Sequence, residues 1–292
     1  MTRQQEGTVG FVGTGNIGSP MVMSLIRAGF DVMVHDLRRA SAASLEDAGA
    51  RFAETHAELA AECSIIGVAV VNDTQLTSLL LGADGLIAAL KPGTTVVVHS
   101  TVLPATVKEI AKTADLHGVH LLDAQVSGGD LRAAQGDLAV MVGGEPENVA
   151  SCSAYFDAIA RRAVHMGPLG SGAGAKIAVQ MMTFGNWIAA MEAMRLAGAL
   201  GIAEDRLADL ATDATCDSWV VQNWGNYDRL QHAHRLAGTP ELYRLFDKDL
   251  HLAVSVGREL DIELPLTAVG SAVLAPAWKQ RLEFGKPEAK DA

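Results

Sequence analysis

The sequence has 292 residues, about twice the modal length of a domain, and its 49% hydrophobic and 20% charged residues are typical of a globular protein with a buried core. This composition excludes a disordered, collagenous or disulfide-framework protein. With 34 acidic and 23 basic residues the net charge is -11, which argues against nucleic acid as a partner.

The cysteines and the N-terminal segment indicate the compartment. Cys63, Cys152 and Cys216 are far apart and have no zinc-ligand spacing, and the nine histidines show no HExxH motif, so no metal is predicted. The polar start, residues 1–7, does not read as a secretory signal, and no apolar run long enough to cross a membrane follows. We therefore expect a cytoplasmic protein without membrane contact.

Short β-branched runs alternate with helical stretches between residues 8 and 142, as expected for βαβ units and a parallel sheet. A helix is predicted next, over about residues 147–160, before a short segment at 162–165. Because every predicted strand is short and apolar, helices are expected on both faces of the sheet. The predicted strands are Val9 to Val12, Val32 to His35, Ile65 to Val70, Val96 to His99, Leu121 to Ala124, and Leu138 to Val142.

The second half of the chain has a different composition. After the glycine-rich stretch at 167–172, alanine, leucine and methionine dominate and β-branched runs almost disappear, which predicts helices, beginning with a long one over about 173–200. We therefore expect an α/β domain over residues 1–166 and an all-helical domain over residues 167–292.

The first predicted turn carries a GxGxxG motif between a strand and a helix. Gly13 permits the tight turn, Gly15 lets the backbone approach a pyrophosphate, and Gly18 allows helix and strand to pack closely. The alternative is a glycine-rich turn without a ligand, which the placement of the motif disfavours. The expected cofactor-binding residues are Gly13, Thr14, Gly15, Asn16, Ile17 and Gly18.

Asp36 ends the second predicted strand, where a carboxylate can bind the adenosine ribose hydroxyls of NAD and would repel a 2′-phosphate. Arg38 and Arg39 could instead bind such a phosphate or simply be solvated. NAD is favoured, NADP is the alternative cofactor, and Arg38 is expected near either. Four further residues, at the ends of two predicted strands, are expected at the cofactor: Val70, Val71, Ser100 and Thr101.

A later strand runs into Ser127, Gly128 and Gly129. Backbone N–H groups of such a turn, together with the serine hydroxyl, can hold a carboxylate without a charged side chain. This suits a small acid substrate. An ordinary strand-ending turn explains the same residues.

Lys176 is one of only three charged residues between Leu169 and Ala203. In apolar surroundings a lysine loses hydration, which lowers its pKa toward the range suited to proton transfer. Gln180 lies one helical turn later and could orient the substrate or the lysine. The alternative is a lysine that reaches from the helix into solvent.

Taken together, these residues resemble the β-hydroxyacid dehydrogenase family, which includes 3-hydroxyisobutyrate dehydrogenase and tartronate semialdehyde reductase. The resemblance spans nearly the whole chain, in four ordered blocks. The matching residues are Gly10 to Met21 with Ala28 to Phe30; Asp123 to Gly129 with Gly136 and Met141 to Gly144; Gly170, Gly172 and Lys176; and Lys248 to Leu250 with Leu252, Ala253, Glu259, Pro265 and Leu266.

The resemblance implies a Rossmann-type N-terminal domain with a mainly parallel sheet, a long linking helix and an all-α C-terminal domain, assembled as a homodimer or homotetramer. It also implies that Lys176 is the general acid/base, that Ser127, Gly128 and Gly129 bind the substrate carboxylate, and that Lys248 lies near the nicotinamide. Ser127 and Gln180 are counted with Lys176 as catalytic.

The chain departs from the family at four positions. Gln180 replaces an asparagine, Gln125 a proline, Arg132 a glycine and His99 an aspartate. The guanidinium of Arg132 could reach an anionic substrate or merely cover the surface. These changes leave the type of reaction standing and put the usual substrates in doubt.

We therefore expect an NAD(P)-dependent dehydrogenase that oxidises a small 3-hydroxyacid or reduces the matching semialdehyde. Two alternatives remain, an imine reductase or other reductase on the same scaffold and a catalytically silent dinucleotide sensor. The presence of Lys176 and Ser127 disfavours both.

Overall fold

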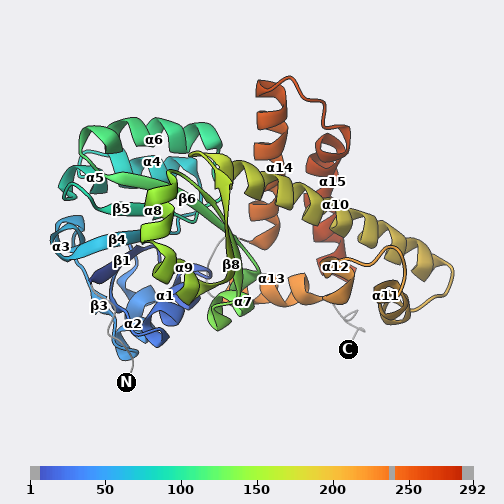
Figure 1. Ribbon diagram of the computed structural model, residues 1–292. Coiled ribbons are helices and arrows are strands. Elements are labelled where there is room, and N and C mark those ends of the chain that lie inside the picture. The colour runs from blue at the N-terminus through green and yellow to red at the C-terminus, as the bar shows by residue number, and fades with distance from the viewer. Residues whose placement is uncertain (1–6, 237–240, 285–292) are drawn as a thin grey trace. The chain divides into compact units, whose positions relative to one another are not determined.

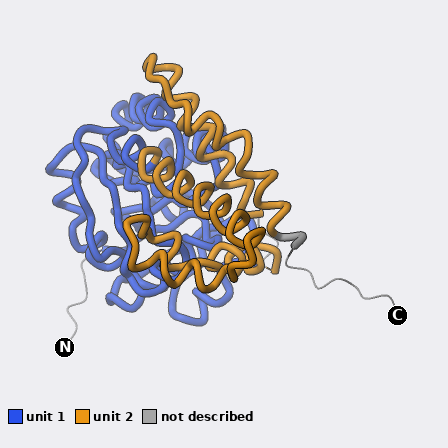
Figure 2. Tube along the Cα trace, turned by 90° about the vertical axis from the view of Figure 1, so that its right-hand side faces the viewer, with its two compact units in different colours: residues 1–176 blue, residues 177–292 orange. Residues whose placement is uncertain are grey.

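The computed structural model describes residues 7–236 and 241–284. The chain divides into two compact units, residues 1–176 and residues 177–292, drawn in blue and orange in Figure 2. Within the described stretches, no helix is both long enough and apolar enough to cross a membrane.

The first unit is built on one eight-stranded sheet in the order β3-β2-β1-β4-β5-β6-β7-β8 (Figure 1). All neighbouring strands are parallel except β6 and β7, which are antiparallel, so the predicted mainly parallel sheet is confirmed. The strands are β1 Thr8–Val12, β2 Asp31–His35, β3 Arg51–Phe52, β4 Cys63–Val68, β5 Thr95–Val98, β6 His120–Ser127, β7 Leu138–Gly143 and β8 Ala160–Gly167.

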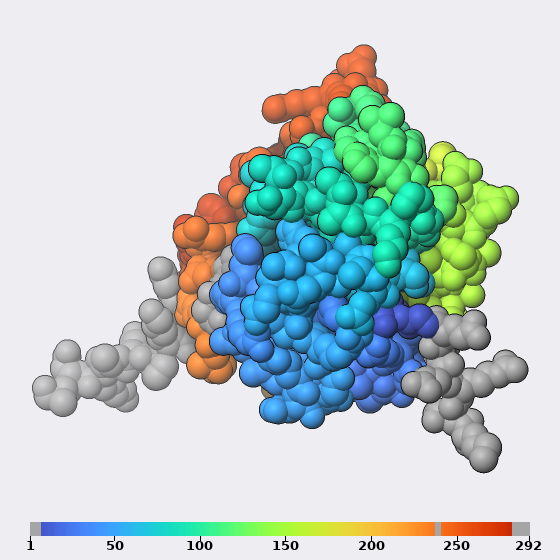
Figure 3. Space-filling model, turned by 90° about the vertical axis from the view of Figure 1, so that its left-hand side faces the viewer, coloured from blue at the N-terminus to red at the C-terminus, as the bar shows by residue number. Residues whose placement is uncertain are grey.

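Apolar side chains on both faces of this sheet pack against helices. Along β5, Val97 joins one hydrophobic cluster, while Val96 and Val98 join a second on the opposite face, as strand geometry requires. Figure 3 shows the side of the unit on which α3 to α6 form much of the surface. The helices of this unit are α1 Gly18–Arg27, α2 Ala43–Asp47 after the short 3-10 helix Arg39–Ala42, α3 His56–Glu62, α4 Asp73–Leu81, α5 Leu86–Ala89, α6 Pro104–Leu116, α7 Gly129–Gln135, α8 Pro146–Ser151 and α9 Ser153–Ile159.

The strand order reverses at β1. The chain passes from β1 through α1 to β2 on one side, and later returns to β4 on the other side of β1. In open parallel sheets, ligands bind outside the carboxyl ends of the strands at such a switch point. The turn between β1 and α1 lies at this position.

The second unit is helical in its described part, as predicted. The long helix α10, Ser171–Ala199, starts in the first unit and supplies Phe184, Trp187 and Met191 to the core of the second. There Trp187 stacks on Trp278 with ring centroids 4.3 Å apart. The other helices are α11 Glu204–Thr212, α12 Trp219–Gln222, α13 Asn226–Leu236, α14 Leu242–Glu259 and α15 Pro265–Phe284.

Several element boundaries differ from the sequence prediction. The two-residue strand β3 and the strand β8 were not predicted, and the predicted helix at 147–160 is two helices that meet at Cys152. The fourth strand begins and ends two residues earlier than predicted, at Cys63 and Val68. These differences leave the fold class unchanged.

Candidate cofactor and substrate sites

The turn between β1 and α1 has the geometry that a dinucleotide requires. Gly13 has a φ of +93°, and a Cβ there would lie 2.3 Å from the Ala69 carbonyl oxygen, while a Cβ on Gly18 would lie 1.9 Å from the Gly13 oxygen. A Cβ on Gly15 would meet no atom within 4 Å, so the space beside its backbone is open to a ligand. Asn16 and Ile17 are half-buried and complete the turn. The first turn of α1 contains no acidic residue, so the partial positive charge of the helix N-terminus is available to a phosphate.

Asp36 follows β2 and joins it to the glycine turn. Its Oδ2 accepts the backbone N–H of Thr14 at 2.8 Å and the Thr14 hydroxyl at 3.1 Å, and its Oδ1 accepts the backbone N–H of Arg38 at 2.8 Å. The Thr14 hydroxyl also lies 2.6 Å from the Ser41 hydroxyl. Because each carboxylate oxygen can accept more than one hydrogen bond, a fixed Asp36 can still bind ribose hydroxyls.

The other predicted cofactor residues of this unit lie at the ends of β4 and β5, the next strands along the sheet from β1. The backbone N–H of Val70 donates to the Ser100 hydroxyl oxygen at 2.8 Å, which ties the two strand ends together. Val71 is 37% exposed, and Thr101 is half-buried. The structure therefore brings these four residues to the same edge of the sheet as Gly13.

Ser127 is the last residue of β6, and α7 follows with no residue between them except Gly128. Gly128 and Gly129 have φ values of +139° and +71°, which favour glycine. No side chain caps the start of α7. Arg132 lies over Gly128, where an added Cβ would be 2.9 Å from the Arg132 Cβ, and the Arg132 Nε donates to Asp137 at 2.9 Å.

Asp123, on the same strand as Ser127, holds the start of α10. Its Oδ1 accepts the backbone N–H of Gly170 and its Oδ2 accepts that of Ala173, both at 2.8 Å, and the residue is fully buried. Burial raises the pKa of the Asp123 carboxyl, and the backbone hydrogen bonds oppose this rise. Asp123 belongs to a block that resembles the family, and an acidic residue within an apolar strand indicates a buried polar contact, but its partners Gly170 and Ala173 are not evident from the sequence.

Lys176 follows Ala173 by three residues on α10 and is buried, with 7% of the residue exposed. The side chain therefore does not extend into solvent, as the alternative interpretation required. Strand β6 carries Ser127 at its end. Because Asp123 of the same strand bonds the start of α10, β6 also fixes the helix segment that carries Lys176.

Gln180, Lys248 and Asp249 lie together in the second unit. The Gln180 Nε2 donates to Asp249 Oδ2 at 2.7 Å, and the Lys248 Nζ lies 2.8 Å from Asp249 Oδ1. Asp249 is 6% exposed. Asp249 belongs to a block that resembles the family but was not predicted as a site residue, and its contact with Gln180, between α14 and α10, reveals its place.

Two further departures from the family form buried hydrogen bonds. The Gln125 Nε2 donates to the Ser100 carbonyl at 3.2 Å. The His99 Nδ1 donates to the Ala124 carbonyl at 2.7 Å, so its Nε2 accepts the hydroxyl of Tyr155, also at 2.7 Å. Burial lowers the pKa of His99 to about 4. Among the described residues, no cluster of three potential metal ligands is present.

Two family models match the chain. Residues 8–167 match the NAD binding domain of 6-phosphogluconate dehydrogenase, and residues 170–285 match the NAD-binding domain of NADP-dependent 3-hydroxyisobutyrate dehydrogenase. Together the two matches span nearly the whole chain.

Several known proteins are similar over nearly their full length. L-Threonate dehydrogenase of Cupriavidus necator is 34% identical over 89% of this chain and 86% of its own. NAD-dependent L-serine dehydrogenase of Pseudomonas aeruginosa is 29% identical over 93% and 92%. The crystal structure of 3-hydroxyisobutyrate dehydrogenase from Salmonella typhimurium is 32% identical, covers 94% of this chain and 95% of that chain, and has a TM-score of 0.82. The resemblance in the sequence is thus confirmed, and the chain belongs to the β-hydroxyacid dehydrogenase family of NAD(P)-dependent oxidoreductases.

Proposed function

We propose that this protein oxidises the hydroxyl group of a small 3-hydroxyacid with NAD, or reduces the matching semialdehyde, with Lys176 as the general acid/base. The observation that carries the proposal is the double role of β6. This strand ends in the Ser127 turn, and through Asp123 it holds the helix start that bears the buried Lys176. Strand β6 thereby positions both the Ser127 turn, which would bind the substrate carboxylate, and Lys176, which would transfer the proton.

The glycine turn and Asp36 fit the dinucleotide. The backbone at Gly13 and Gly15 and the N-terminus of α1 would hold the pyrophosphate, and Asp36 would accept the ribose hydroxyls. When bound, the nicotinamide ring accepts or delivers the hydride. The ends of β4 and β5, at Val70 and Ser100, would border the cofactor farther along the sheet.

The substrate carboxylate would bind the Ser127 hydroxyl and the backbone N–H groups of Gly128 and Gly129. In the oxidation, the Lys176 amine takes the proton from the substrate hydroxyl oxygen as the hydride leaves the carbon that bears this hydroxyl, and a carbonyl group forms. In the reduction, the Lys176 ammonium returns that proton to the carbonyl oxygen. The burial of Lys176 keeps bulk water from competing with the substrate for this proton.

By the family resemblance, Gln180 would orient the substrate or the lysine, and Lys248 would lie near the nicotinamide. Both side chains contact Asp249, which fixes their positions. Gln180 would then serve as a positioning residue, in place of the asparagine of the family. We assign residues 1–166 to cofactor binding and residues 167–292 to substrate binding and oligomerisation.

An oligomer is supported by apolar residues on two helices of the second unit. Met182 and Leu196 on α10, and Leu266 and Val269 on α15, are all more than half exposed. Because α10 and α15 pack together at Trp187 and Trp278, we propose that these exposed apolar side chains form part of a subunit interface in a homodimer or homotetramer. The three free cysteines support a reducing, cytoplasmic location.

The proposal is tested with Lys176→Ala in the purified protein. General acid–base groups contribute roughly 100- to 10,000-fold, so kcat should fall by that range while NAD still binds with its usual dissociation constant. Lys112→Ala is the matched control, because the side chain of this lysine on α6 is 71% exposed. The assay follows NADH formation with 3-hydroxyisobutyrate, L-threonate and L-serine. A near-normal kcat for Lys176→Ala would remove this lysine from the mechanism.

A further inference from the structure

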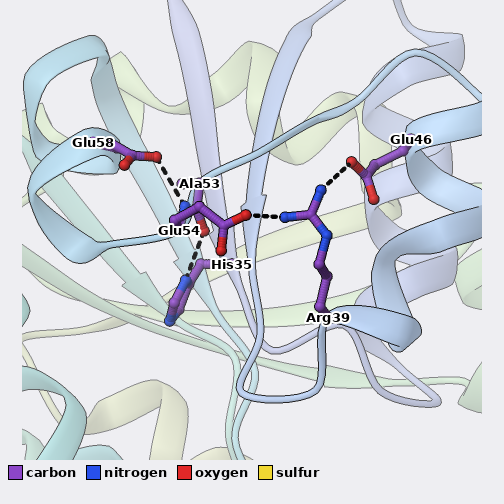
Figure 4. Close-up of polar contacts among 6 residues, drawn as sticks. All are labelled: His35, Arg39, Glu46, Ala53, Glu54 and Glu58. Atoms are coloured by element: carbon purple, nitrogen blue, oxygen red, sulfur yellow. Dashed lines mark hydrogen bonds and ion pairs between the residues drawn. The ribbon is translucent and has the colours of Figure 1, made fainter.

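Arg39 begins the 3-10 helix after β2, three residues beyond Asp36, and its guanidinium is held by two carboxylates (Figure 4). Its Nη2 lies 3.2 Å from the Glu46 Oε1, and its Nη1 bonds Glu54. The guanidinium carbon also lies 4.4 Å from the centroid of the Phe52 ring. Both terminal nitrogens of Arg39 therefore point to acidic partners.

The two glutamates come from different elements, which fixes the direction of the arginine. Glu46 lies on α2, and Glu54 follows β3. Glu58, on the first turn of α3, accepts the backbone N–H of Glu54 at 2.8 Å and so holds the segment that carries Glu54 (Figure 4). A single exposed ion pair contributes little, but here two carboxylates and a ring act on one guanidinium.

This arrangement determines the charge that a dinucleotide would meet beyond Asp36. NADP differs from NAD by a 2′-phosphate on the adenosine ribose, and an arginine close to the end of β2 is the usual partner for that group. Arg38 and Arg39 are the two arginines in this place. Glu46 and Glu54 offset the positive charge of Arg39. The charges left in this segment are then the carboxylate of Asp36 and the exposed guanidinium of Arg38, which oppose each other. A dianionic phosphate would therefore gain little binding energy there.

We propose that Glu46 and Glu54 are specificity residues for the cofactor, which favour NAD over NADP by holding Arg39 in an ion-paired position. This inference rests on the proposed dinucleotide site at Gly13 and Asp36. It assigns a function to two acidic side chains that lie outside the glycine turn and bond Arg39. Their removal would free Arg39 to bind the 2′-phosphate.

The test measures dissociation constants for NAD and NADP by isothermal titration calorimetry on the full chain. In the double variant Glu46→Gln with Glu54→Gln, NADP should bind about tenfold more tightly and NAD within about twofold of its original affinity. Adenosine 2′,5′-bisphosphate, which lacks the nicotinamide, should show the same gain as NADP. Adding Arg39→Gln to the double variant should abolish the gain.

Glu58→Gln is the matched control, because it removes one negative charge nearby without breaking an ion pair of Arg39. Equal gains in Glu58→Gln and Glu54→Gln would show a general field effect and overturn the proposal, as would a gain that survives Arg39→Gln or no gain at all. Thermal melting checks that each variant is folded. If the unmodified protein bound neither dinucleotide, the proposed site itself would fail, whereas normal NAD binding with unchanged discrimination would refute only this inference.

Discussion

Replacing Asp123 by asparagine tests whether the carboxylate on β6 holds α10 in place. Asparagine has nearly the same shape but one oxygen, so it can accept only one of the two backbone N–H groups, from Gly170 and Ala173, that Asp123 accepts at 2.8 Å. Its amide NH₂ would then face the other N–H, donor against donor. Each hydrogen bond to a buried charged group contributes about 1.5–3 kcal/mol, and an unpaired buried donor costs about 1–3 kcal/mol.

The expected loss in the free energy of unfolding is therefore about 3 kcal/mol, since the lower desolvation cost of the neutral amide offsets part of the two terms. For a unit of this size, 1 kcal/mol corresponds to roughly 2–4 °C, so Tm should fall by about 6–12 °C. Because α10 carries Lys176, we also expect kcat to fall at least tenfold below the temperature of melting, with NAD binding retained.

The assay combines thermal melting, NAD titration and steady-state kinetics, with Asp84→Asn, an exposed aspartate, as the control. A melting temperature and kcat close to those of the unmodified protein would refute the argument that Asp123 positions the helix. A loss of stability with unchanged kcat would show that Asp123 supports the fold but does not set the position of Lys176.

Two further predictions concern His99 and Gln180. The pKa of His99 is lowered to about 4 in the folded state, so below its usual pKa the unfolded chain binds a proton that the folded chain does not. The free energy of unfolding should therefore fall by about 1.4 kcal/mol per pH unit, or roughly 3 kcal/mol in total, as pH drops from about 6.5 to 4. Urea unfolding measured across this pH range should show that His99→Asn lacks this fall. Identical pH profiles of the variant and the unmodified protein would contradict the prediction. Gln180→Asn shortens the side chain that donates to Asp249 at 2.7 Å, so this hydrogen bond should be lost and kcat/KM should fall about fivefold. The control is Gln222→Asn, which alters an exposed glutamine bonded to Asp217 and should leave kcat/KM unchanged. An unchanged kcat/KM in Gln180→Asn would mean that this contact does not serve the reaction.

The fold class could be predicted from the sequence because its signals are local. The alternation of short apolar strands with helices, and the change to alanine and leucine after residue 172, need only neighbouring residues. Strand β8 was missed because its residues, ARRAVHMG, are mostly exposed and include two arginines. Strand β3 has only two residues, too few to show a period.

The candidate site was predictable only in part, for a related reason. The glycine turn, Asp36 and the Ser127 turn each follow a strand and carry their own local pattern. The roles of Asp123, Asp249 and Arg39 depend on contacts with residues distant in the sequence or on other elements, such as Asp123 with Ala173. No periodicity or motif reports such contacts.

The length of β6 has a consequence for how this enzyme can diverge. Side chains alternate along a strand, so Asp123, Gln125 and Ser127 project from one face, where Asp123 bonds the start of α10, Gln125 bonds the Ser100 carbonyl and Ser127 begins the turn proposed to bind the substrate. An inserted or deleted residue between Asp123 and Ser127 would place some of these side chains on the opposite face from the others, so the three could no longer share one face. We therefore expect substrate preference to change through exchanges in α7, such as at Arg132, and β6 to tolerate a replaced residue better than an insertion or a deletion.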